Sequence, residues 1–173
     1  MSYSVKELTL PLQPTAAIHA TVPLGQLAPW LQKAYGEIIT VLAAQHVSAT
    51  GPPYGRFAFR GDAVDVEAGF PVQHTFIRDR RVVMSALPAG MAAVTTHFGP
   101  YEQLSDAYKD VQAWLDVHGF QQAGPHWEVY YSDPASEPDP ATWRTDVFVP
   151  FVPSALAATG PSALGRQRSG TPA

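Results

Sequence analysis

The sequence predicts an α+β domain made of two copies of a β-α-β-β unit, and the main evidence is an internal repeat. When the chain is shifted by 73 residues, segment 31–57 falls on 104–130 without a gap, and six positions are identical. The two halves also share the order of their apolar patterns: a strand, a helix and two further strands. Such self-similarity indicates a duplicated structural unit. We expect the units to span about 5–80 and 81–153, within a single domain over 1–153.

The first unit is predicted to begin with a strand over 15–22, which is apolar and rich in β-branched residues. Between Leu24 and Leu42, apolar residues recur every three or four positions, as they do on the buried side of an amphipathic helix. Two more strands are expected over 51–59 and 64–72.

The second unit repeats this order. A strand is expected over 91–97, and a helix then carries apolar residues at helical spacing between Leu104 and Leu115. Strands over 126–131 and 145–151 complete the unit.

Both ends of the second helix carry recognisable signals. Gly99 is suited to cap the helix, and Pro100 is suited to its first position. Gly119 is suited to the residue that follows its end.

Alternation along 64–72 divides the side chains between two faces of the sheet. Val64, Val66, Ala68 and Phe70 share the face expected to lie under a helix, whereas Glu67 belongs to the other face. Glu67 can face solvent or reach the groove, and a solvent-facing acid is expected. Helices on one face leave the second face for solvent or a ligand. Two units side by side also leave a groove between them, where pockets often form.

A single acid, Glu128, lies in the middle of the aromatic strand 126–131. Neighbours two apart on a strand share a face, so Glu128 lies with His126 and Tyr130, and Trp127 lies on the opposite face. Such an acid can point into solvent, pair with a structural charge or line a ligand site. If it is buried among rings, its pKa should rise.

Three segments resemble the GyrI-like family, the effector-binding domain of multidrug regulators. They are LPAGMAAVTTHFGPYEQLSDAY, GPHWEVYYSDP and TDVFVPF, supported by GPPYGRFAF and VDVEAGFPV in the first half. The resemblance covers roughly Val5 to Pro153. It implies a duplicated SHS2-type fold, with antiparallel sheets, helices on one face and a small-molecule groove.

The resemblance also implies site residues. Glu128 occupies the position of the family's buried pocket glutamate. The rings expected to contact a ligand with it are those of Phe57, Trp127, Tyr130 and Phe148. Two roles remain possible for Tyr54, core packing and the pocket. Its equivalence to Trp127 in the repeat puts it on the helix side, unless a bulge at Gly55 turns it inward.

The expected function is binding of a small planar aromatic or cationic drug-like compound. One alternative is an enzyme, a hydrolase that opens cyclopropane-bearing genotoxic compounds, with Glu128 activating water and Tyr54 binding the developing oxyanion. Another is a protein-interaction module, such as a gyrase inhibitor. Tyr35, Tyr108 and Trp114 are interpreted as core, and His97 as a structural hydrogen-bonding residue.

Composition excludes several other classes. The 173-residue chain has no cysteine and a net charge of −4, so it lacks a basic nucleic-acid footprint. No signal peptide or membrane span is recognised, which favours a cytoplasmic protein. Neither a metal site nor a cofactor is expected, and 154–173 is expected to be a flexible tail. The oligomeric state is left open.

Overall fold

The computed structural model describes residues 3–132 and 137–154. The expected tail lies outside these residues, apart from Ser154. The described strands and α-helices, in chain order, are Lys6–Leu10 (β1), Gln13–Pro23 (β2), Leu27–Ala44 (α1), Tyr54–Arg60 (β3), Ala63–Pro71 (β4), Val83–Leu87 (β5), Gly90–Phe98 (β6), Leu104–His118 (α2), Phe120–Gln122 (β7), His126–Tyr130 (β8) and Arg144–Pro153 (β9).

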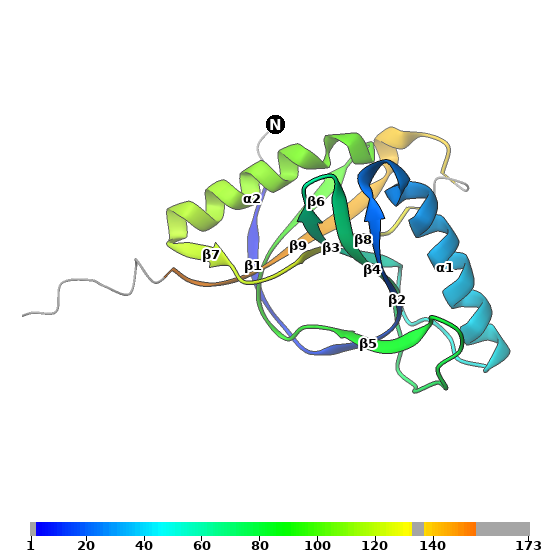
Figure 1. Cartoon of the computed structure of the whole chain (residues 1–173). Coiled ribbons are helices and arrows are strands. Elements are labelled where there is room, and N and C mark those ends of the chain that lie inside the picture. Colours follow the sequence, from blue (N-terminus) through cyan, green and yellow to red (C-terminus); the bar gives the residue numbers. More distant parts are fainter. Residues whose placement is uncertain (1–2, 133–136, 155–173) are drawn as a thin grey trace, which may run out of the picture.

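The strands form one curled antiparallel sheet, and the predicted α+β class is confirmed (Figure 1). Its order is β1-β6-β9-β8-β3-β4-β2-β5, with β7 paired to the side of β9. Equivalent strands of the two halves occupy symmetric places in this order, with β8 and β3 as the central pair. The two halves therefore meet at these strands.

The structure has three strands that the sequence pattern does not predict, β1, β5 and β7. β1 comes from the first half but pairs with β6 of the second, and β5 comes from the second half but pairs with β2 of the first. The halves thus exchange their leading strands. Periodicity cannot detect this exchange, because the partner of an edge strand is set by tertiary pairing.

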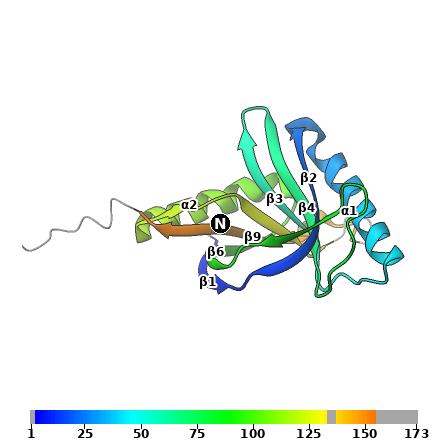
Figure 2. The same cartoon turned by 60° about the horizontal axis from the view of Figure 1, so that its bottom comes forward.

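Both helices pack on the same face of the sheet, which we call the helix face (Figures 1 and 2). α1 covers a core that includes Ile18 and Phe70, and α2 covers a core that includes Val147 and Val149. Val64 and Val66 also pack against the start of α1, as their alternation predicts. The opposite face, which carries Trp127, is called the inner face.

The start of α2 differs slightly from its prediction. A 3-10 turn, Tyr101–Gln103, precedes the helix, and Pro100 is the residue that caps this turn. The predicted end is confirmed, because Gly119 follows α2 with a left-handed φ of 69°.

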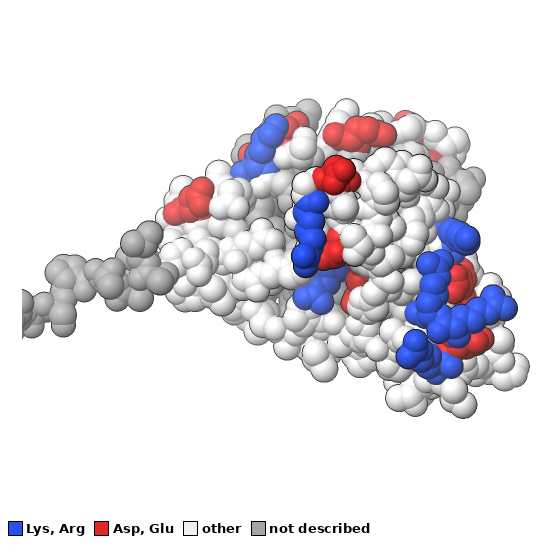
Figure 3. Space-filling view, viewed as in Figure 1, with Lys and Arg blue, Asp and Glu red and all other residues white. Residues whose placement is uncertain are grey.

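Charges of both signs are interspersed on the face shown in Figure 3. Some of the described charges form ion pairs, such as Arg81 with Glu37 at 2.9 Å and Arg60 with Asp65 at 2.5 Å. No helix within the described residues is long and apolar enough to cross a membrane.

Candidate ligand-binding site

The candidate site is centred on Glu128 of β8. This strand pairs with β3 on one side and β9 on the other, so Glu128 lies near the middle of the sheet. Its side chain belongs to the helix face, and the residue is 8% exposed. A carboxylate at this position is therefore withdrawn from solvent.

Two tyrosine hydroxyls donate hydrogen bonds to this carboxylate. Tyr108 of α2 donates to Oε1 at 2.6 Å, and Tyr130 of β8 donates to Oε2 at 2.7 Å. None of the ion pairs in the described part of the chain includes Glu128. Its charge is thus hydrogen-bonded but has no cationic side chain in contact with it.

Burial raises the pKa of Glu128, and the hydrogen bonds from Tyr108 and Tyr130 and the nearby ring of His97 partly oppose this rise. Burial also lowers the pKa of His126 to about 4, so this imidazole is neutral above that pH. The His126 ring on the same face as the acid is therefore uncharged at neutral pH.

Tyr35 of α1 is the counterpart of Tyr108 in the internal repeat. Its buried hydroxyl has no hydrogen-bond partner among the described residues. Burial raises the pKa of Tyr35, and the negative charge of the nearby Glu128 carboxylate adds to this rise. The two helices therefore each direct a tyrosine towards the same acid.

Other rings extend the site along the helix face. The centroid of the His126 ring lies 4.6 Å from the ring centroid of Tyr108 and 5.9 Å from that of Phe57. The Tyr101 ring lies 5.6 Å from that of Tyr130, in an edge-to-face arrangement. The surroundings of Glu128 are thus predominantly aromatic.

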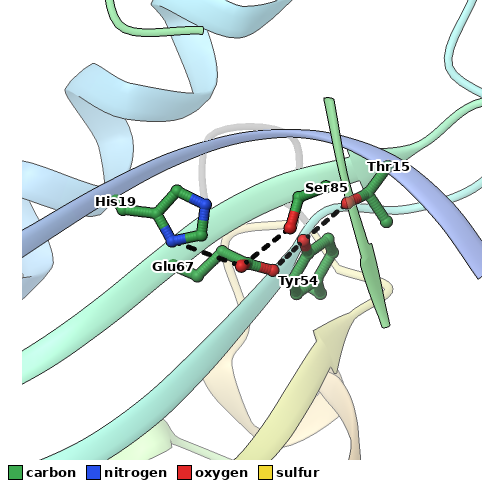
Figure 4. Close-up of polar contacts among 5 residues, drawn as sticks. All are labelled: Thr15, His19, Tyr54, Glu67 and Ser85. Carbon is green, nitrogen blue, oxygen red and sulfur yellow. Dashed lines mark hydrogen bonds and ion pairs between the residues drawn. The ribbon is translucent and has the colours of Figure 1, made fainter. Parts of the chain in front are cut away.

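Tyr54 lies on the other side of the sheet. It pairs with Val129 and Gly69, and its hydroxyl bonds to Glu67 and Thr15 on the inner face (Figure 4). Ser85 donates to the second Glu67 oxygen at 3.0 Å. Tyr54 and Glu128, which the hydrolase alternative places in one site, therefore lie on opposite faces of the sheet.

Three sequence expectations about this region need correction. Tyr54 and Trp127 share a face, as their symmetry requires, but that face is the inner one. No bulge turns Tyr54, because β3 keeps continuous register with both neighbours through Gly55. Glu67 was expected to face solvent, yet it is 7% exposed and receives the hydrogen bonds described above.

The predicted ligand-contacting residues are divided between the two faces. Phe57 and Tyr130 share the helix face with Glu128. Trp127 and Phe148 stack on each other on the inner face, with ring centroids 5.3 Å apart. One ligand beside Glu128 would thus meet the first pair and not the second.

Sequence reasoning missed Tyr108 and Tyr35, which it interpreted as core. Their identity at equivalent positions of the repeat was the available signal. His97 does make the structural hydrogen bonds expected of it: its ring nitrogens lie 2.7 Å from the Tyr3 hydroxyl and 3.1 Å from the carbonyl oxygen of Pro100.

Within the described residues, no cluster of three or more His, Asp or Glu side chains is arranged to hold a metal. Glu128 lines neither the hollow at the end of α1 nor the hollow beside β9. Glu128 itself is buried beneath the tyrosines that bind it.

Comparison with known proteins gives a family match over nearly the whole described chain. The sequence profile of the GyrI-like small molecule binding domain matches residues 3–152. No curated protein matches the sequence.

Several solved structures share the fold. EcmrR in a complex with DNA superposes with a TM-score of 0.76 at 20% identity; the alignment covers 87% of this chain and 58% of EcmrR. A hydrolase from Listeria innocua gives 0.65 at 14% identity, covering 87% and 93% of the two chains. SAV2435, bound to tetraphenylphosphonium, gives 0.61 at 12% identity, covering 92% and 98%.

Proposed function

Since the chain belongs to the family of the GyrI-like small molecule binding domain, we propose that it binds an aromatic cation at Glu128. The observation that carries the proposal is a carboxylate, 8% exposed, that receives two tyrosine hydrogen bonds and contacts no cationic side chain. A bound cation would supply the missing opposite charge in a site of low polarity.

The rings around Glu128 favour a cation that is itself aromatic. The faces of tyrosine rings attract cations, and their area packs against flat ligands. Tyr35, Tyr108 and Tyr130 would supply these faces. The binding of tetraphenylphosphonium by SAV2435, which shares the fold, is in keeping with this ligand class.

Binding should depend on pH. Because burial raises the pKa of Glu128, this side chain stays neutral to a higher pH than a glutamate in solvent does. A cation prefers the ionised form, so its affinity should rise with pH until Glu128 is fully ionised. Binding below that point should release a proton.

Calorimetric titration with methyltriphenylphosphonium and with neutral triphenylphosphine oxide tests the proposal. The cation should bind the wild type, and Glu128→Gln should weaken its binding at least about tenfold, the loss of one desolvated charge pair. Glu67→Gln is the matched control, because it removes a second buried glutamate from the inner face. Equal affinity of Glu128→Gln and the wild type would overturn the proposal.

A second candidate function is hydrolysis of a cyclopropane-bearing compound. In this version Tyr108, and not Tyr54, would bind the developing oxyanion. The supporting observation is the contact of two tyrosine hydroxyls with an acid whose pKa is raised. The oxygen of a water molecule would attack the ring carbon while Glu128 takes a proton from that water. The electrons of the broken carbon–carbon bond would pass to a conjugated carbonyl, whose oxygen then receives the proton from Glu128, so that the product gains one water.

Mass spectrometry separates this candidate from simple binding. A cyclopropane-bearing quinoid incubated with the wild type should gain one water, and Glu128→Gln should abolish the gain. Tyr108→Phe should slow the reaction, whereas Tyr54→Phe should not. A compound recovered unchanged from the wild type leaves binding as the function of the site.

A further inference from the structure

A hollow that Glu128 does not line includes Arg56 and Trp127 of the inner face. Its volume is about 500 Å³, within the range of small-molecule pockets. It opens where β3, β8 and β9 meet the turn between β5 and β6. Its lining includes Arg56, Trp127, Met91, Pro125, Pro150 and Glu7.

Arg56 is the unusual residue of this hollow. Its Nε is buried and has no hydrogen-bond partner among the described residues. It also forms none of the ion pairs in that part of the chain. A buried polar nitrogen without a partner calls for an explanation, and a bound ligand is one.

The neighbours of Arg56 explain why it lacks a protein partner. Across the ladder it faces Glu67 on β4 and Trp127 on β8. The Glu67 carboxylate is already held by Tyr54, Ser85 and His19. The acid across the strand from Arg56 is thus committed to other groups, and the Arg56 Nε is left without a partner at the lining of the hollow.

We propose that this hollow is a second ligand site, which takes an aromatic carboxylate. The planar guanidinium of Arg56 matches a carboxylate in a two-pronged hydrogen bond. Trp127, stacked flat on Phe148, and the nearby prolines supply apolar area for the ring of the ligand. This site differs from the Glu128 site in its face and in the sign of its charge.

Glu7 is the one acid among the residues that line the hollow, and it does not cancel the positive charge that Arg56 provides. It lies on the edge strand β1 and is exposed, whereas the Arg56 Nε is buried. A charge in solvent is screened far more than a buried one. The electrostatic preference of the hollow is therefore set by Arg56.

Calorimetric titration with naphthoate and with neutral naphthamide tests the site. Naphthoate should bind the wild type in the millimolar range or tighter, and more tightly than naphthamide. Arg56→Gln should weaken naphthoate binding about tenfold or more, as expected for loss of a charge-assisted hydrogen bond. Arg56→Lys keeps the charge but not the fork, and should weaken binding less.

Two controls locate the effect. Arg60→Gln removes the same charge from an exposed position of the same strand and should leave naphthoate binding unchanged. Glu128→Gln should also leave it unchanged. The inference is overturned if naphthoate does not bind, if folded Arg56→Gln binds it as tightly as the wild type, or if Glu128→Gln alone alters its affinity.

Discussion

Gly55 and Glu128 are direct partners in the antiparallel pairing of β3 with β8. They are also 73 residues apart, the spacing of the internal repeat. The two positions that the repeat makes equivalent therefore face each other, and the pseudo-two-fold axis of the domain passes between them. One carries the buried acid and the other carries no side chain.

The room above Gly55 is occupied by the ring of Phe57. A Cβ at position 55 would lie 2.4 Å from the Cζ atom of that ring, which is itself buried. Gly55→Ala should therefore destabilise the domain by about 1–3 kcal/mol, as overpacking of a core does. Thermal unfolding measures this change.

Gly36→Ala in α1 is the matched control for Gly55→Ala. A Cβ there meets no other atom within 4 Å. The substitution should stabilise the domain by about 0.5–1 kcal/mol, the usual gain inside a helix. Two alanine substitutions with the same sign of effect would contradict the packing described for Gly55.

Tyr108 and Tyr35 are equivalent in the repeat but differ in their hydrogen bonds. Tyr108→Phe removes a donor from a buried carboxylate and should cost about 1.5–3 kcal/mol. Tyr35→Phe removes a hydroxyl without a partner and should be neutral or stabilising. Urea unfolding at neutral pH compares the two; a larger cost for Tyr35→Phe would count against the described geometry.

Glu128→Gln should stabilise the free protein, or leave it unchanged, at neutral pH. The pKa of Glu128 is raised above 4.5, so between that pH and the folded-state pKa the folded protein holds a proton that the unfolded chain has lost. The stability contributed by the neutral acid is present below 4.5 and is lost as pH rises.

The free energy of unfolding, measured from pH 4 to 8, tests the direction of this pH dependence. The advantage of Glu128→Gln over the wild type should grow with pH across the interval. A loss of about 3–5 kcal/mol at neutral pH would instead show that Glu128 belongs to a buried ion pair.

His126 should give the folding stability the opposite dependence on pH. Its pKa falls from 6.5 to about 4 on burial, so between these values the unfolded chain binds a proton that the folded protein does not. Stability should fall as pH decreases through this interval, by up to about 3 kcal/mol. His126→Gln should remove this slope, whereas His74→Gln, at an exposed position, should not.

Tyr54→Phe should affect stability without affecting cation binding. It removes a hydrogen bond to the buried Glu67 carboxylate, at a cost of about 1.5–3 kcal/mol. Because Tyr54 lies on the inner face, the affinity for methyltriphenylphosphonium should match that of the wild type. A calorimetric titration in which Tyr54→Phe loses affinity as Glu128→Gln does would contradict the division between the faces.

The sequence predicts the duplicated units and most of their elements because these follow from local periodicity. The spacing of apolar residues marks both helices, and alternation in β4 marks its buried face, since all of one set is apolar. In β8 both sets contain rings, so alternation divides Glu128 from Trp127 without showing which set lies under the helices. That ambiguity put Tyr54 and Trp127 on the wrong face.

The sequence by itself determined the order of both helices and of the six strands in the repeat, and the prominence of Glu128. Only the tertiary structure decided that Tyr108 binds this acid with Tyr35 near it, that β1 and β5 are exchanged, and that Tyr54 binds Glu67 instead. The physical reason is that these relationships depend on strand register and helix placement. Both are set by contacts between residues far apart in the chain, which local patterns do not encode.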